Sequence, residues 1–138
     1  MIQTSQFTLP AHERGFHLIT DEVVKNLPKL FRAGLLHLFI CHTSAGITLN
    51  ENADPDVRHD FPLFFDRLAP EHLPGLRHTL EGSDDMPAHI KASLLGHSIS
   101  IPIANHQLVL GQWQGIVLGE FRNQATPRRF QCTMIGED

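Results

Sequence analysis

The chain has 138 residues, of which 41% are apolar and 19% charged, and its formal net charge is −4. This length suits one domain over residues 1–138 that buries about two thirds of the surface of its unfolded chain. The mild negative charge offers no basic surface for nucleic acid or an anionic membrane, and no apolar run reaches the roughly 20 residues of a membrane span. Because the polar start MIQTSQFT lacks the pattern of a signal peptide, we expect a cytoplasmic protein.

The first half of the chain predicts extended segments around one short helix. Residues 3–10 and 14–20 read as extended, after which Thr20 or Asp21 can cap a short helix. The residues on its predicted buried face are Val23, Val24, Leu27 and Phe31. Pro28 should kink or divide that helix. The apolar run over residues 35–43 predicts a buried, central strand, and a shorter strand follows Gly46.

Two further helices and a group of strands are predicted in the rest of the chain. Asp54 followed by Pro55 marks the start of a helix. Apolar residues recur at helical spacing along it and predict that this helix packs on the sheet; they are Val57, Phe61, Phe64, Phe65 and Leu68. Asp85 and Pro87 repeat the signal for a third helix, which Gly96 ends. Residues 97–103, 106–113, 115–121 and 128–135 read as strands. Helices first and strands last favour an α+β fold with a largely antiparallel sheet.

Ten histidines are the unusual feature of the composition. Strand alternation places His42, in the stretch HTSAG, on the inward face at the end of the central strand. Two interpretations remain open for it. It is either a core histidine bonded to a carbonyl group, or a metal ligand or proton carrier at the rim of a pocket, where the small residues from Ser44 to Gly46 leave room for a substrate.

His89 follows Asp85 by one helical turn, so a carboxylate can hold its ring and fix its tautomer. The alternative is a solvated charge cluster with a surface histidine. His78 precedes Glu81 by three residues in a loop-like segment and is a weak candidate by itself. Three neutral imidazoles can bind zinc and leave a fourth position open, but the separations of 36 and 11 residues between these histidines match no short zinc motif.

Two other stretches have both a structural and a functional interpretation. Asn50, Glu51 and Asn52 either line a site or form a turn. Trp113 lies in GQWQG between glycines, and it predicts an anchor in the core or in a subunit interface, with stacking on a substrate as the alternative.

Several stretches together resemble a known family. RGFHLITDE, LLHLFICHTSAGITLNENADPDVRHD, EGSDDMPAHIKASLLG, SISIPI and LGQWQGIVLGEFR, in this order, are similar to the YjbQ-type family, also called the secondary thiamine-phosphate synthase family. The residues that match its pattern are His42, Thr43, Ser44, Asn50, Glu51, Asn52, His78, Glu81, Gly82, Asp85, His89, Lys91, Ser93, Trp113, Gln114, Gly115 and Arg122. The resemblance implies a sheet curled into a half barrel, two to three packed helices and a homotrimer. It also implies a weak activity that joins a pyrimidine pyrophosphate to a thiazole phosphate.

Our hypothesis from the sequence is a pocket in which His42, His78 and His89 hold a divalent metal ion, zinc by preference because imidazoles suit it. Glu81, Asp85 and His89 are the expected acids and proton carriers. The expected substrate-binding residues, for a small phosphorylated molecule, are Ser44, Asn50, Asn52, Lys91 and Arg122. Two alternatives stay open: metal-assisted hydrolysis of a phosphorylated or amide metabolite, and a trimer that binds a metabolite without catalysis.

Overall fold

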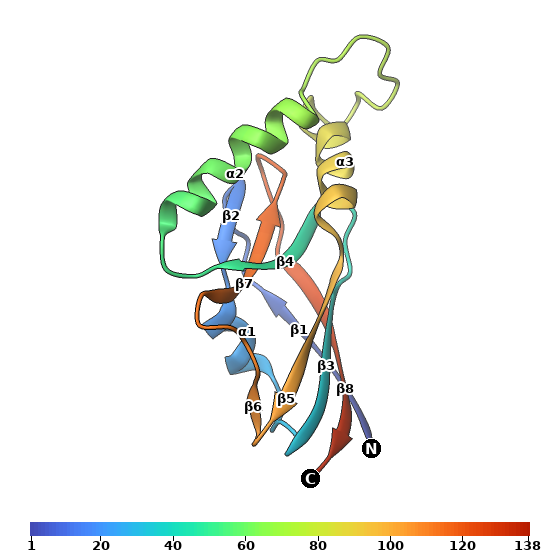
Figure 1. Cartoon of the computed structure of the whole chain (residues 1–138). Helices are drawn as coiled ribbons and strands as arrows, with labels where there is room; N and C mark the ends of the chain where they lie inside the picture. The colour runs from blue at the N-terminus through green and yellow to red at the C-terminus, as the bar shows by residue number, and fades with distance from the viewer.

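A computed structural model describes all 138 residues (Figure 1). It contains eight strands and three helices. Their bounds are β1 Ile2–Leu9, β2 Gly15–Leu18, α1 Thr20–Asn26, β3 Ala33–Ile40, β4 Ala45–Glu51, α2 Pro55–Leu68, α3 Asp85–Leu95, β5 Ser98–Ala104, β6 Gln107–Leu108, β7 Gln114–Glu120 and β8 Arg128–Glu137. None of the helices is long and apolar enough to cross a membrane.

The strands form two sheets in which every neighbouring pair is antiparallel. The larger sheet has the order β1-β8-β3-β5-β6 and the smaller one the order β2-β7-β4. Together they curl into a half barrel, and α2 and α3 lie at the end away from the chain termini (Figure 1). The predicted α+β fold with an antiparallel half barrel and three helices is therefore confirmed, as is the central place of β3 between β8 and β5.

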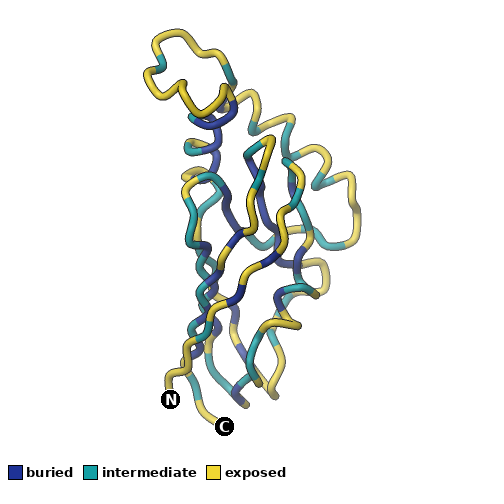
Figure 2. Tube along the Cα trace, turned by 180° about the vertical axis from the view of Figure 1, so that it is seen from behind, coloured by how far each residue is buried: buried dark blue, intermediate teal, exposed yellow.

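The hydrophobic core fills the inside of the half barrel. Leu36, Leu38 and Ile40 alternate along β3 toward it and are at most 1% exposed, as are Phe130 and Met134 on β8. Figure 2 shows this alternation of buried and exposed residues along the strands. A second, smaller cluster joins α3 to β2 and β7, and its buried members are Phe16, Ala88, Ala92, Val117 and Phe121. Because α3 contributes to this cluster, packing fixes the helix that carries Asp85 and His89.

The first helix is shorter than its apolar pattern suggested. It ends at Asn26, and Pro28 follows one residue after the C-cap, because a proline disfavours helical geometry in the residue before it. Val23 is buried, but Val24 is 49% exposed, so that part of the prediction is wrong. Thr20 does not cap the helix; its Oγ1 accepts a hydrogen bond from the Ile116 amide at 2.8 Å.

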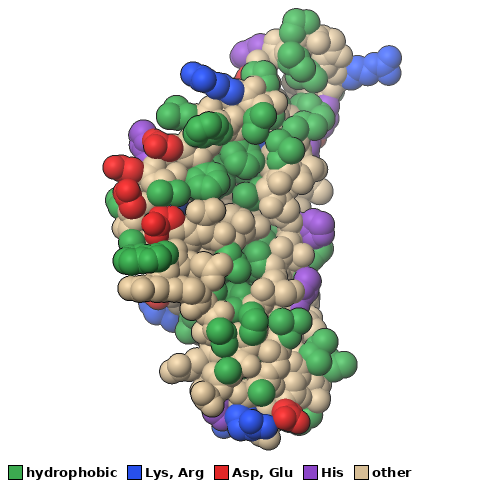
Figure 3. All heavy atoms as spheres, in the orientation of Figure 1, with side chains coloured by type: hydrophobic (Ala, Val, Ile, Leu, Met, Phe, Trp, Pro, Cys, Tyr) green, Lys and Arg blue, Asp and Glu red, His purple; other side chains and the backbone are tan.

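The second helix begins where predicted but packs only partly on the sheet. The Asp54 side chain caps it by accepting a bond from the Asp56 amide at 2.9 Å. Phe61 and Phe65, one turn apart, pack against Phe16 of β2. Phe64 and Leu68 lie on another face of the helix and are 70% and 67% exposed, so their predicted burial is wrong. Figure 3 shows apolar side chains gathered on the surface over this helix.

Residues 106–113 form less strand than the sequence predicts. Asn105 and His106 have positive φ angles of 52° and 61°, which makes a tight turn after β5. Only Gln107–Leu108 then pairs with β5, since Gly111 begins the next turn, which the Gln114 amide closes on the Gly111 carbonyl at 3.0 Å. Trp113 lies in that turn and is 59% exposed, so it is not a core residue of the chain.

Candidate functional site

Three side chains from two segments meet at the start of α3. Asp85 is the first residue of this helix, His89 follows one turn later, and His78 comes from the connection between α2 and α3. His78 Nε2 lies 2.5 Å and His89 Nε2 lies 3.1 Å from the same oxygen, Asp85 Oδ2. The three potential ligand atoms all lie within 4.8 Å of one another. The predicted contact between Asp85 and His89 is confirmed.

Asp85 is the centre of this cluster and is only 1% exposed. Its Oδ1 accepts a hydrogen bond from Arg122 Nη1, which leaves Oδ2 for the two imidazoles. Burial disfavours a charged carboxylate, but the hydrogen bond from His78 and the charges of His89 and Arg122 outweigh it. They hold the pKa of Asp85 below its usual value. Asp85 is therefore an anion at neutral pH, surrounded by donors.

Arg122, just after β7, joins the start of α3 to the smaller sheet. Its Nε donates to Asp84 Oδ2 at 2.9 Å, and its Nη2 donates to the Glu81 carbonyl at 2.9 Å. Asp84 also accepts a bond from the Asn123 amide at 2.9 Å. Against the cost of burial, these bonds lower the pKa of Asp84 and raise the pKa of Arg122. Arg122 thus positions Asp85, since every donor nitrogen of its guanidinium is used.

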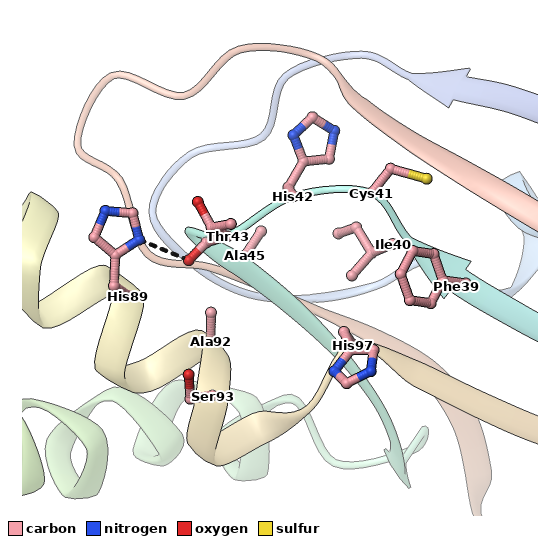
Figure 4. Close-up of a pocket in the computed structure, with 10 residues that line it drawn as sticks. All are labelled: Phe39, Ile40, Cys41, His42, Thr43, Ala45, His89, Ala92, Ser93 and His97. Carbon is pink, nitrogen blue, oxygen red and sulfur yellow. Dashed lines mark hydrogen bonds between the residues drawn. The ribbon is translucent and has the colours of Figure 1, made fainter.

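The other side of the His89 ring is held by the backbone of residue 43. Thr43 is in the loop between β3 and β4, and its carbonyl oxygen lies 2.9 Å from His89 Nδ1, as the dashed line in Figure 4 marks. A histidine that binds a metal commonly donates its second ring N–H to a carbonyl group in this way. The loop is itself fixed, because Arg128 Nη2 donates to Ser44 Oγ at 3.1 Å.

His89 therefore lies between two acceptor oxygen atoms, the Thr43 carbonyl oxygen and Asp85 Oδ2, the second of which His78 also contacts. A neutral imidazole has one N–H group, so it can satisfy the Thr43 carbonyl or the Asp85 carboxylate, but not both. With Nδ1 as the donor to Thr43, a second proton or a metal ion has to lie between His89 Nε2 and Asp85 Oδ2. Two imidazole nitrogens and one carboxylate oxygen are also a donor set that zinc accepts.

His42 lies apart from this cluster. The sequence suggested His42, His78 and His89 as the metal ligands, but in the structure the third member beside His78 and His89 is Asp85. His42 Nε2 accepts a hydrogen bond from the Arg129 amide at 2.8 Å. Burial and the nearby charges of Arg128 and Arg129 lower its pKa, so the ring is neutral. His42 and His89 nevertheless line the same hollow of about 460 Å³, which also includes His97. In Figure 4 this hollow lies between the end of β3, the start of β4 and α3.

The remaining predicted site residues have structural contacts. Lys91 is 2% exposed and its Nζ lies 2.5 Å from Asp66 Oδ1 of α2. Asn50 Oδ1 accepts a bond from the Glu51 amide at 2.8 Å, and Asn52 Nδ2 donates to the Gln112 and Gln114 carbonyls at 3.2 and 3.1 Å, as in a turn. Glu81 has an exposed side chain, and only its backbone contacts Arg122. None of these side chains belongs to the group around Asp85.

Sequence reasoning missed the buried ion pair that supports the loop of residues 42–44. Glu120 of β7 is 0% and Arg128 of β8 4% exposed, and their side chains form two bonds of 2.7 and 2.5 Å. No local signal marks this pair, because β7 and β8 belong to different sheets and meet only in the folded chain. The weak available hint was Glu120 at the end of the apolar run of β7.

A small antiparallel half barrel with an imidazole–carboxylate cluster at the start of one helix defines the class of this protein. Residues 5–137 match the family model described as UPF0047 protein YjbQ-like, and the chain belongs to this family. The resemblance seen in its motifs is therefore confirmed.

The relatives cover nearly the whole chain. It is 50% identical over 132 residues to the UPF0047 protein YjbQ of Escherichia coli O157:H7, which covers 94% of this chain and 95% of that protein. It is 43% identical over 119 residues to the UPF0047 protein YugU of Bacillus subtilis strain 168, covering 86% and 87%. Among solved structures, the conserved hypothetical protein TT1486 of Thermus thermophilus superposes with a TM-score of 0.81 at 36% identity, covering 93% of this chain and 97% of the other.

Proposed function

We propose that His78, Asp85 and His89 bind one divalent metal ion, zinc by preference, and that the site hydrolyses a small phosphorylated or amide metabolite. The observation that carries this proposal is the position of His89. One ring nitrogen faces the Thr43 carbonyl at 2.9 Å and the other faces the Asp85 carboxylate at 3.1 Å. A metal ion on Nε2 satisfies both oxygens and leaves the ring neutral.

The cluster has dimensions that suit zinc. Ligand atoms of a tetrahedral zinc site, with bonds of about 2.0–2.1 Å, lie roughly 3.3 Å apart. His89 Nε2 and Asp85 Oδ2 are 3.1 Å apart, close to that value. His78 Nε2 is nearer, at 2.5 Å from the same oxygen, and must move back by less than about 1 Å. His78 can do so because the segment that carries it has no regular structure.

Three protein ligands leave a position open for water or substrate, and a divalent ion supplies a Lewis acid there. The protein contributes the rest. Arg122 fixes one oxygen of Asp85 and thereby aims the other at the two imidazoles. Thr43 fixes the tautomer of His89. The Glu81 side chain, exposed close to the site, is the available carboxylate for a proton transfer.

Hydrolysis is favoured over thiamine-phosphate synthesis by the state of the nearby cations. The synthase reaction requires groups that hold a pyrophosphate and a phosphate while the pyrophosphate departs. Lys91 is buried against Asp66, and Arg122 is bound to Asp84 and Asp85. Both cations are already paired with carboxylates, so the proposal places a substrate oxygen at the metal position itself.

Metal content tests the proposal directly. Untagged protein is loaded with zinc, dialysed and measured by inductively coupled plasma mass spectrometry, with an expected value of about one ion per chain. His89→Ala and Asp85→Asn should each lose it, whereas His97→Ala, which alters the same hollow outside the cluster, should keep it. Zinc far below one ion per chain in the wild type, or equal zinc in all variants, refutes the metal site.

Activity is then tested with two probes on the zinc-loaded protein. p-Nitrophenyl phosphate represents a phosphorylated substrate and p-nitroacetanilide an amide. Zinc-dependent hydrolysis of either one, lost in Asp85→Asn, supports the proposal. Zinc-independent formation of thiamine phosphate from its two precursors, with neither probe cleaved, overturns the hydrolase in favour of the synthase. Zinc binding with no turnover of any of these compounds favours a metabolite-binding protein instead.

A further inference from the structure

The hollow of about 460 Å³ lies beside the imidazole–carboxylate cluster, and His89 belongs to both. Its walls are the end of β3, the start of β4 and α3 beyond His89 (Figure 4). Sites for small molecules have volumes of about 300–1,000 Å³, so the hollow is large enough for one. The proposed metal ion needs only the Nε2 side of His89, so what the hollow binds is a separate question.

His42 presents to this hollow an N–H group that has no partner in the protein. Its Nε2 accepts a hydrogen bond from the Arg129 amide at 2.8 Å and therefore carries no proton. Burial, together with the charges of Arg128 and Arg129, lowers the pKa of His42, so the ring is neutral and its one proton lies on Nδ1. In Figure 4, Nδ1 is the ring nitrogen on the side of Thr43 and His89. The acceptor for this N–H group has to come from a bound molecule or from water.

Other polar groups on the wall are free as well. In Figure 4 the one hydrogen bond among the ten residues drawn joins His89 to the Thr43 backbone. It does not involve the hydroxyl groups of Thr43 and Ser93 or the ring of His97, which all line the hollow. A hydroxyl or an imidazole group can accept a hydrogen bond as well as donate one. A molecule in the hollow can therefore turn a carbonyl oxygen to His42 and an N–H group to another part of the wall.

The rest of the wall is apolar and carries no charge. Phe39, Ala45 and Ala92 line it, and none of the ten lining residues is Lys, Arg, Asp or Glu. The charge of Arg129 affects His42 but this arginine does not line the hollow. A phosphate group inside the hollow would therefore lose water without gaining a cation. A flat apolar group can pack there against the aromatic ring and the alanines.

We propose that the hollow binds an uncharged molecule of the carboxamide class with a flat apolar group, and that His42 Nδ1 donates a hydrogen bond to its carbonyl oxygen. The apolar group packs on Phe39 and Ala92, and the amide N–H pairs with one of the free hydroxyl or imidazole groups. A molecule held in this way lies beside His89, so the hollow selects an amide over a phosphorylated molecule as the substrate. This choice of substrate rests on the proposed function, but binding in the hollow requires no metal ion.

Nuclear magnetic resonance of the isotope-labelled full chain tests the binding, with benzamide as the probe, in metal-free and in zinc-loaded protein. Long-range proton–nitrogen spectra of the imidazole rings should show the His42 proton on Nδ1. Benzamide should shift the backbone amide signals of Thr43 and Ser93 in a saturable way, with a dissociation constant in the millimolar range that is usual for so small a ligand. Benzoate has the same ring with a charge, and it should bind weaker by about 10-fold or more.

Three variants locate the ligand. Ser93→Trp fills the hollow from an exposed position and should abolish the saturable shifts. Leu94→Trp adds the same side chain at the next residue, which is 57% exposed and does not line the hollow, and should bind benzamide as the wild type does. His42→Gln keeps an acceptor for the Arg129 amide but loses the Nδ1 donor, and it should weaken benzamide binding about 5-fold. Circular dichroism verifies the fold of all three.

Failure of this amide site differs from failure of the metal site. No saturable benzamide binding in either metal state, benzoate bound as tightly as benzamide, or unchanged binding in Ser93→Trp would each overturn the amide site, whatever the zinc content. Zinc far below one ion per chain, with benzamide bound by the metal-free protein, would refute the metal site and support this one. A His42 proton on Nε2, or unchanged benzamide binding in His42→Gln, would overturn the role of His42.

Discussion

Replacing Arg128 with methionine should destabilise the protein strongly. Arg128 is 4% exposed and forms two bonds with Glu120, which is 0% exposed. Without the arginine, the buried carboxylate keeps only a bond of 3.3 Å from the Arg122 amide. Removing one partner of a buried ion pair costs about 3–5 kcal/mol because the other charge stays buried and unpaired. For a domain of this size that corresponds to a fall in Tm of roughly 10–25 °C.

Urea unfolding followed by far-ultraviolet circular dichroism measures this loss. Fluorescence is a poor probe, because Trp113 is already 59% exposed in the folded chain. Arg128→Lys is the matched control for charge, and it should recover only part of the loss, since a lysine cannot form both bonds. The double variant with Glu120→Gln should be more stable than Arg128→Met alone, because no buried charge then remains. A loss below about 1 kcal/mol for Arg128→Met would refute this account of the pair.

Two further predictions concern other titratable side chains. Asp66→Asn should lower the free energy of unfolding by about 3 kcal/mol, because it leaves the buried Lys91 ammonium without an anion. Lys91→Met should lower it less, since the half-exposed Asp66 can turn to water. Thermal unfolding of both variants measures this difference. Burial and Arg128 lower the pKa of His42, so the unfolded chain binds a proton that the folded chain refuses. Stability should therefore fall as the pH drops below about 6.5, and His42→Gln should reduce that fall in urea unfolding between pH 7 and 5; an equally steep decline in the variant would contradict it.

Local patterns were sufficient for most of the secondary structure. Asp54 with Pro55 gave the start of α2, and Gly96, with φ of 107°, gave the end of α3. The same patterns failed on α2, where helical spacing predicted burial for Phe64 and Leu68. Helical spacing shows that residues share a side of a helix, but it does not show how wide a stripe the sheet covers.

For the candidate site, the spacing of Asp85 and His89 was enough to predict their contact, because one helical turn brings the two side chains together wherever the helix lies. It could not decide the rest. The role of Arg122 depends on the contact between the end of β7 and the start of α3, 37 residues apart in the chain. The place of His42, bonded to the Arg129 amide rather than to the cluster, depends on β8 lying beside β3. Such contacts are set by the packing of the sheets, and only the tertiary structure decides them.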